Sequence, residues 1–97
     1  MKDLRFEWNE KKNQANIRKH GVSFGEACTT FHDEYAIQFF DPGHSANEER
    51  FLLLGMSLKL RVLVVCHCFR ESETAVRIIS ARKTDQAEEQ DYWRHRT

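Results

Sequence analysis

The side chains best suited to chemistry lie in and between two β-branched segments, residues 61–69 and 74–83. Burying an arginine without a partner is costly, so arginines beside such apolar runs indicate a cleft that receives an anion. RNA can be cut without a metal when a base takes the 2′-hydroxyl proton, an acid protonates the leaving oxygen, and arginines stabilise the charged phosphate. The candidate catalytic residues are His67, Arg70, Glu71, Arg77 and Arg82.

The roles of these residues depend on where the strands point them. His67 has an ordinary pKa of about 6.5 and suits either proton transfer, and Glu71 is a second candidate base. The alternatives are a satisfied core histidine and a solvated turn carboxylate. Arg77 and Arg82 are five residues apart and point to opposite faces of a regular strand, so both reach one groove only if the strand bends. If only one reaches it, Arg82 together with His67 is favoured.

Cys66-His67-Cys68 contains residue types that bind metals. Strand alternation places His67 opposite the two cysteines, and no second cysteine-rich pair completes a tetrahedral set, so we expect no metal and no other cofactor. Cys66 and Cys68 are interpreted as small core residues, because same-face strand neighbours are too far apart for a disulfide. An odd number of cysteines without a disulfide pattern favours a cytoplasmic protein.

The charges are balanced in number but not in position. The chain has 15 basic and 15 acidic residues, which argues against a generic nucleic-acid binder. Residues 26–49 hold six acids and no Lys or Arg, whereas residues 50–83 hold seven bases and two acids, a net charge of +5. We interpret this as one positive and one negative flank, with ordinary solvated charge as the alternative. The residues expected to contact RNA are Lys12, Lys19, His20, Arg61 and Lys83.

The elements that position these residues follow from periodicity and capping. Asn9 and Gly21 bound a helix over 10–20, and Ser23 with Glu26 fits a capping box that starts a second helix. A last helix is predicted over 85–95 after Thr84. The expected strands are residues 4–8, 34–41, 50–57, 61–69 and 74–83.

Short links between most strands favour antiparallel neighbours. The 97 residues therefore predict a single α+β domain, residues 1–97. Its expected architecture is a curved antiparallel sheet of about four strands plus a short N-terminal strand, packed with two N-terminal helices and one C-terminal helix. Neither a membrane-spanning run nor a signal-peptide core is evident, and no membrane association is expected.

Several blocks resemble those of a known family. They are Phe6-Glu7-Trp8-Asn9, Lys19-His20-Gly21-Val22-Ser23-Phe24-Gly25-Glu26-Ala27, Glu49-Arg50-Phe51, Arg77-Ile78-Ile79-Ser80-Ala81-Arg82-Lys83, and Glu88-Glu89 with Tyr92. In this order they are similar to the BrnT-type toxins. The resemblance implies a RelE/ParE-like fold and a type II toxin that cleaves RNA and arrests translation. It further implies neutralisation by a BrnA-type antitoxin, with operator DNA reached only through the antitoxin complex.

The last predicted helix carries little apolar surface. Tyr92 and Trp93 on it are expected to be left for a partner, and they are the candidate antitoxin-binding residues. The competing hypothesis is a partner-dependent binding module that acts as a co-repressor with the antitoxin and has no active site of its own.

Overall fold

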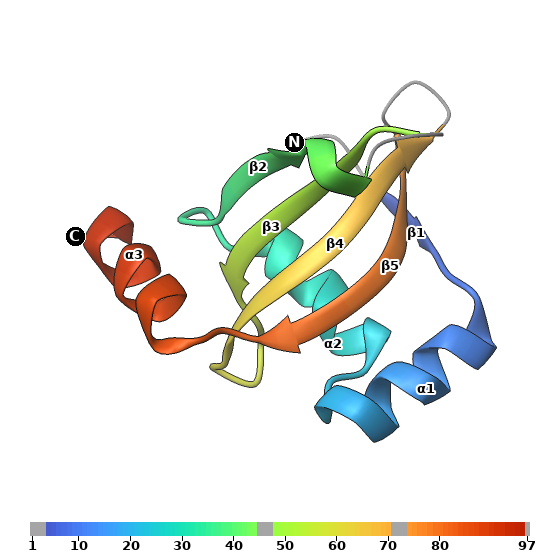
Figure 1. Ribbon diagram of the computed structural model, residues 1–97, viewed down its shortest axis with the longest axis horizontal. Helices are drawn as coiled ribbons and strands as arrows, with labels where there is room; N and C mark the ends of the chain where they lie inside the picture. The colour runs from blue at the N-terminus through green and yellow to red at the C-terminus, as the bar shows by residue number, and fades with distance from the viewer. Residues whose placement is uncertain (1–3, 45–47, 71–73, 97) are drawn as a thin grey trace.

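The protein is built on one five-stranded sheet, seen in the computed structural model, which describes residues 4–44, 48–70 and 74–96 (Figure 1). The strands lie in the order β1-β5-β4-β3-β2. Their bounds are Arg5–Glu7 (β1), Ile37–Asp41 (β2), Arg50–Met56 (β3), Val62–Arg70 (β4) and Ala75–Lys83 (β5). The helices are α1 (Glu10–His20), α2 (Phe24–Thr29) and α3 (Gln86–Arg96), with short 3-10 turns η1 (Thr30–His32) and η2 (Pro42–His44).

The sheet is mixed rather than wholly antiparallel. Strands β2 to β5 pair antiparallel through short links, as expected. The prediction is wrong at β1, which pairs parallel with β5 in the register Arg5 to Ala75. Most of the described chain separates these two strands, so the connection is long enough for the crossover that parallel pairing needs.

Helix α1 is held to the fold by asparagine side chains rather than by apolar burial. Its ends are as predicted: the Asn9 side chain caps the start, and Gly21 follows the end with a φ of 69°. The buried Asn16 amide donates to the carbonyl of Ala81 at 2.8 Å, and its oxygen accepts from the Ala81 N–H at 3.2 Å. Asn13 accepts from the backbone N–H at the start of α2. These bonds tie the first helix to the last strand and to the start of α2.

One face of the sheet is covered by α1 and α2, and the main core lies between them. The buried apolar residues of this core are Val22, Phe24, Ala27, Leu53, Leu63, Val65, Val76, Ile78 and Ala81. Phe24, Ala27, Cys28 and Phe31, which follow one another at helical spacing, all pack here. Ser23 caps α2 by accepting from the Glu26 N–H at 3.0 Å.

The opposite face is covered only in part, by α3. Tyr92 of α3 packs there against a smaller cluster that includes Leu54 and Val64. The helix starts one residue later than expected, and Asp85 rather than Thr84 caps it, because Asp85 and Glu88 each accept from the other's backbone N–H. Figure 1 shows α3 beside the sheet, away from α1 and α2. The part of this face that α3 does not cover is called the open face.

None of the described helices is long and apolar enough to cross a membrane.

Candidate functional site

The open face of the sheet contains a groove of about 470 Å³ beside α3. Its floor is made by residues that lie opposite one another across β3, β4 and β5, and such pairs share a face. Cys66, for example, is paired with Leu52 on one side and with Ser80 on the other. The lining residues are Asp41, Arg50, Leu52, Val64, Cys66, Ile79, Ser80 and Arg82.

A β-bulge in β5 decides which arginines face the groove. Cys66 pairs with Ser80, but its neighbour His67 pairs with Ile78, so Ile79 is an extra residue in β5. An extra residue reverses the alternation of side chains beyond it. Arg77 and Arg82 are five residues apart and would face opposite ways in a regular strand, yet the bulge puts both on the open face. The bend that Arg77 and Arg82 require in order to share one groove is therefore present, as the bulge in β5.

Arg82 is fixed at the wall of the groove by α3. Its Nη1 and Nη2 donate to the two carboxylate oxygens of Glu88 at 2.8 and 2.9 Å. Donating to Glu88 raises the pKa of Arg82, and accepting from Arg82 lowers the pKa of Glu88. The Arg82 side chain is still 43% exposed. A guanidinium that is restrained but accessible can receive an anion with little loss of conformational entropy.

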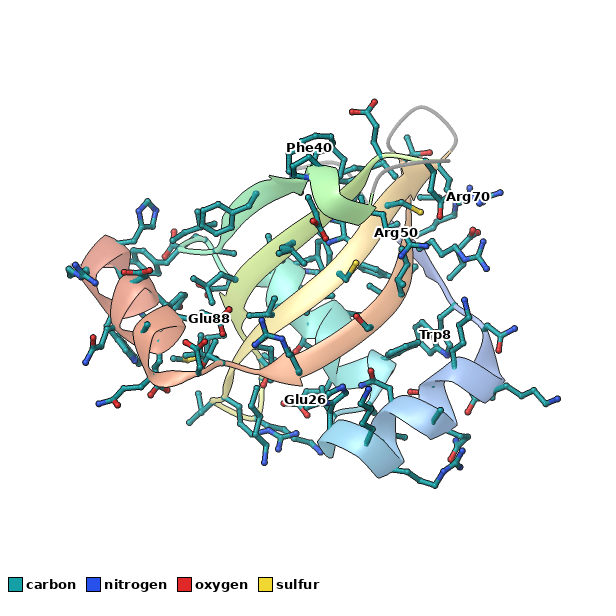
Figure 2. The ribbon with its side chains drawn as sticks, viewed as in Figure 1. Trp8, Glu26, Phe40, Arg50, Arg70 and Glu88 are labelled. Carbon is teal, nitrogen blue, oxygen red and sulfur yellow. The ribbon has the colours of Figure 1, made fainter. Side chains whose placement is uncertain are left out.

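The other arginines of the open face continue this positive surface. Figure 2 shows Arg50 at the end of the sheet away from the β3–β4 turn, with Arg70 farther toward β1. Arg50 on β3 is paired with Asp41 on β2. The Nη2 atom of Arg50 lies 3.9 Å from a Glu48 carboxylate oxygen. Arg70 forms an ion pair with Glu7, in which Nε lies 3.3 Å from Oε1. Arginine and carboxylate are therefore close together at the groove, as acid–base chemistry on a phosphodiester needs.

The imidazole of His67 is on the other side of the sheet, inside the core. It is 0% exposed. Both nitrogens have partners, since Nδ1 lies 3.1 Å from the Val65 carbonyl oxygen and Nε2 lies 3.1 Å from Gln38 Oε1. Burial lowers the pKa of this histidine. The rings packed around it are Phe31, Phe51 and Phe69. The structure matches the alternative of a satisfied core histidine, and His67 does not line the groove.

A family model described as the ribonuclease toxin BrnT of type II toxin–antitoxin systems matches residues 8–88. The chain belongs to the BrnT family. The crystal structure of the Brucella abortus ribonuclease toxin BrnT, determined at 1.1 Å, matches with a TM-score of 0.66 and 26% identity, over 86% of this chain and 99% of that one. A search of curated proteins finds no match.

The BrnT match supports the α+β fold with a five-stranded mixed sheet and three helices. It also makes this chain a ribonuclease-family toxin of a type II pair, for which an antitoxin is the partner. The RNA-contact set predicted for this BrnT-family chain does not gather at the groove. Lys12, Lys19 and His20 belong to α1, on the covered face of the sheet. None of the five residues in that set lines the groove.

The two residues predicted to meet the antitoxin have different environments in this BrnT-family fold. Tyr92 is 0% exposed, and its hydroxyl donates to Asp33 Oδ2 at 2.6 Å. Burial, and then the bond to Asp33, raise the pKa of Tyr92 to about 12. The expectation that Tyr92 is left exposed is wrong, because its ring anchors α3. Trp93 is 43% exposed on the outer side of α3.

The sequence reasoning missed three residues of the groove. Asp41 was assigned only to a strand end, whereas Arg50 and Ser80 were assigned only to strands and to family-like blocks. Their signal was the register of β2, β3 and β5, which becomes known only when the strands are paired. Cys66 was predicted as core but is half-buried at the groove, and burial raises the pKa of its thiol. Glu71 lies outside the described residues.

Within the described parts of the chain, no three His, Cys, Asp or Glu side chains gather as a metal-binding group.

Proposed function

We propose that the groove binds the phosphodiester backbone of RNA and that the protein is an endoribonuclease that needs no metal. One observation carries this proposal: the bulge in β5 brings Arg77 and Arg82 to the face where Arg50 and Asp41 meet. Guanidinium groups match the geometry of phosphate oxygens and stabilise the charge that develops on them. The family match supports the ribonuclease class, and the arginines that line the groove support the proposal that RNA binds there.

The reaction follows from the groups in the groove. The 2′-oxygen attacks the adjacent phosphorus while its proton passes to Asp41, the carboxylate among the described groove-lining residues. The bond from phosphorus to the 5′-oxygen breaks, and a proton from solvent completes the 5′-hydroxyl. Arg82 and Arg50 hold the phosphoryl oxygens, with Arg77 and Arg70 on the adjoining backbone. The product is a 2′,3′-cyclic phosphate.

The cellular setting is proposed on the same basis. Cleavage of messenger RNA in the cytoplasm arrests translation, and a BrnA-type antitoxin neutralises the toxin. Operator DNA is contacted through the antitoxin complex. The fold, a twisted sheet with helices on one face and an arginine-lined groove on the other, belongs with the RelE/ParE-like toxins.

The test is cleavage of labelled single-stranded RNA by purified protein in excess EDTA. Cleavage is expected to continue and to leave 2′,3′-cyclic ends. Asp41→Asn is expected to slow it by about 10²-fold or more, as loss of a general base does. The matched control is Glu49→Gln, since Glu49 is the exposed acid before Arg50 and does not line the groove. Loss of cleavage in EDTA, with recovery on adding a divalent ion, would contradict the mechanism.

A second candidate is a non-catalytic co-repressor that acts only with its antitoxin. The carboxylate partner of Arg82 favours this second function. Both terminal nitrogens of the Arg82 guanidinium already donate to Glu88, so they are engaged before any phosphate arrives. Expression of the toxin alone separates the two functions. The ribonuclease arrests growth by itself, and the co-repressor does not.

A further inference from the structure

The turn between β3 and β4, residues 57–61, presents two leucines to solvent. Leu58 is 78% exposed and Leu60 is 79% exposed, and among the described large apolar residues Phe40 follows at 50%. Neither leucine belongs to either core cluster. Single exposed apolar residues are common, but two on one turn concentrate exposed apolar surface at its tip.

Leu60 also has a strained backbone. Its φ is +63°, and within the described residues it is the one non-glycine residue with a positive φ. This left-handed region favours glycine or asparagine, because the Cβ of other residues meets the backbone there. A leucine in this position gains no packing that offsets the strain, since its side chain is in solvent. The requirements of folding therefore do not explain a leucine at position 60.

The turn is nevertheless fixed to the body of the molecule. Ser57 donates from Oγ to the buried carboxylate of Glu26 at 2.7 Å, and Arg61 donates to the same carboxylate from Nε at 2.9 Å. The Leu58 N–H donates to Thr29 Oγ1 at 3.0 Å, and the Leu60 N–H to the Ser57 carbonyl at 2.9 Å. Burial acts to raise the pKa of Glu26, but the hydrogen bonds from Arg61 and Ser57 outweigh it and lower that pKa. The two leucines are thus held in place before any partner arrives, which lowers the entropic cost of binding.

The charge around the leucines is basic. Lys59 stands between them, and Arg61 donates to the carbonyl of Gly21, which follows the basic last turn of α1. Lys83 pairs with Leu63, two residues beyond Arg61. Glu26, the acid at this place, is buried and paired with Arg61. A partner that complements this tip has an apolar pocket bordered by Asp or Glu side chains. An RNA backbone would match the lysines but offers nothing for the leucines.

We propose that Leu58 and Leu60 are a docking point for an acidic, apolar segment of a protein partner, and that this partner is the antitoxin. The identity of the partner rests on the proposed function, whereas the chemistry of the tip does not. None of the turn residues lines the groove, so the docking point is separate from the site of cleavage. Binding there adds affinity without competing with RNA for the arginines.

The test measures binding of the purified BrnA-type antitoxin to toxin variants by calorimetry or biolayer interferometry. Leu58→Gln and Leu60→Asn are each expected to weaken binding at least tenfold. Leu60→Asn keeps or raises the melting temperature, because asparagine tolerates the left-handed backbone. The control is Phe40→Gln, which removes an exposed apolar side chain on β2 and is expected to leave the affinity unchanged. RNA cleavage by both turn variants is expected to equal that of wild type.

Three results would overturn the proposal. One is wild-type antitoxin affinity in both turn variants. The second is an affinity loss in Leu60→Asn that comes with a lower melting temperature, which would make the leucine structural. The third is a loss of binding to an RNA oligonucleotide, to anionic lipid vesicles or to a second copy of the chain, with antitoxin affinity intact. If no variant cleaves RNA but the turn variants still lose antitoxin affinity, the proposed ribonuclease fails and this inference stands.

Discussion

Arg82 offers a sharp test of the groove, because one side chain has both a structural and a chemical contact there. Replacing it with alanine removes the bidentate pair with Glu88 and also removes a guanidinium from the groove wall. The pair is worth only about 0.5–1 kcal/mol, since the Arg82 side chain is 43% exposed and the pair is screened by solvent. The melting temperature should fall by no more than about 4–8 °C in a domain of this size.

The expected effect on cleavage is much larger. Removing one donor that stabilises a developing oxyanion lowers kcat by about 10²–10³-fold, or roughly 3–4 kcal/mol in the activation free energy. Arg82→Lys keeps the charge but loses the fork, so an intermediate rate is expected. Single-turnover cleavage of a labelled RNA, measured beside thermal unfolding, gives both quantities for each variant.

Glu88→Gln is the matched control. It removes the same ion pair from the α3 side, leaves an oxygen that can still accept from the Asp85 N–H, and keeps the guanidinium at the groove. Its loss of stability should equal that of Arg82→Ala within about 0.5 kcal/mol, yet its cleavage rate should stay within about threefold of wild type. Equal loss of cleavage in the two variants would refute the reasoning, because the Arg82–Glu88 ion pair, and not the guanidinium in the groove, would then determine the cleavage rate.

Two further predictions concern the anchor of α3. Tyr92→Phe removes a buried hydroxyl that donates to the Asp33 carboxylate, and is expected to lower the free energy of unfolding by about 2 kcal/mol in urea titrations. An equal cost for Trp93→Ala, which removes a partly exposed side chain, would argue against this anchor. Burial acts to raise the pKa of Asp33, but hydrogen bonds from Tyr92 and from the Met56 and Tyr35 N–H groups lower it below its ordinary 3.8. The stability that Asp33 contributes is therefore present above that value and lost as pH falls through the folded pKa. Asp33→Asn should flatten the acid limb of a stability–pH curve, and an unchanged limb would show that other carboxyl groups carry it.

Local signals in the sequence were sufficient for most of the elements. Asn9, Gly21 and Ser23 all act as the caps that their types and positions predict, because capping involves neighbours three or four residues away. Gly55 lies within β3, where a Cβ would be 3.1 Å from the Ala36 Cβ and 3.2 Å from the Thr30 carbonyl oxygen. Close approach is the reason for that glycine.

The site was harder to predict, because it depends on register. The parity of Arg77 and Arg82 was counted correctly for a regular strand, but the extra residue Ile79 in β5 reverses it, and nothing in the local sequence marks that bulge. His67 looked available because it is polar within an apolar strand. Its two partners come from Val65 and from Gln38, a residue 29 positions away that only the folded sheet brings near.

The tie between the first helix and the last strand has a consequence for biosynthesis. Asn16 is hydrogen-bonded to Ala81, and β1 pairs with β5. The N-terminal third of the fold therefore lacks these contacts until the ribosome has made nearly all of the described chain. Arg77 and Arg82 emerge at that same late moment. A nascent chain therefore cannot assemble the groove, or cut the message proposed as its substrate, before β5 has left the ribosome.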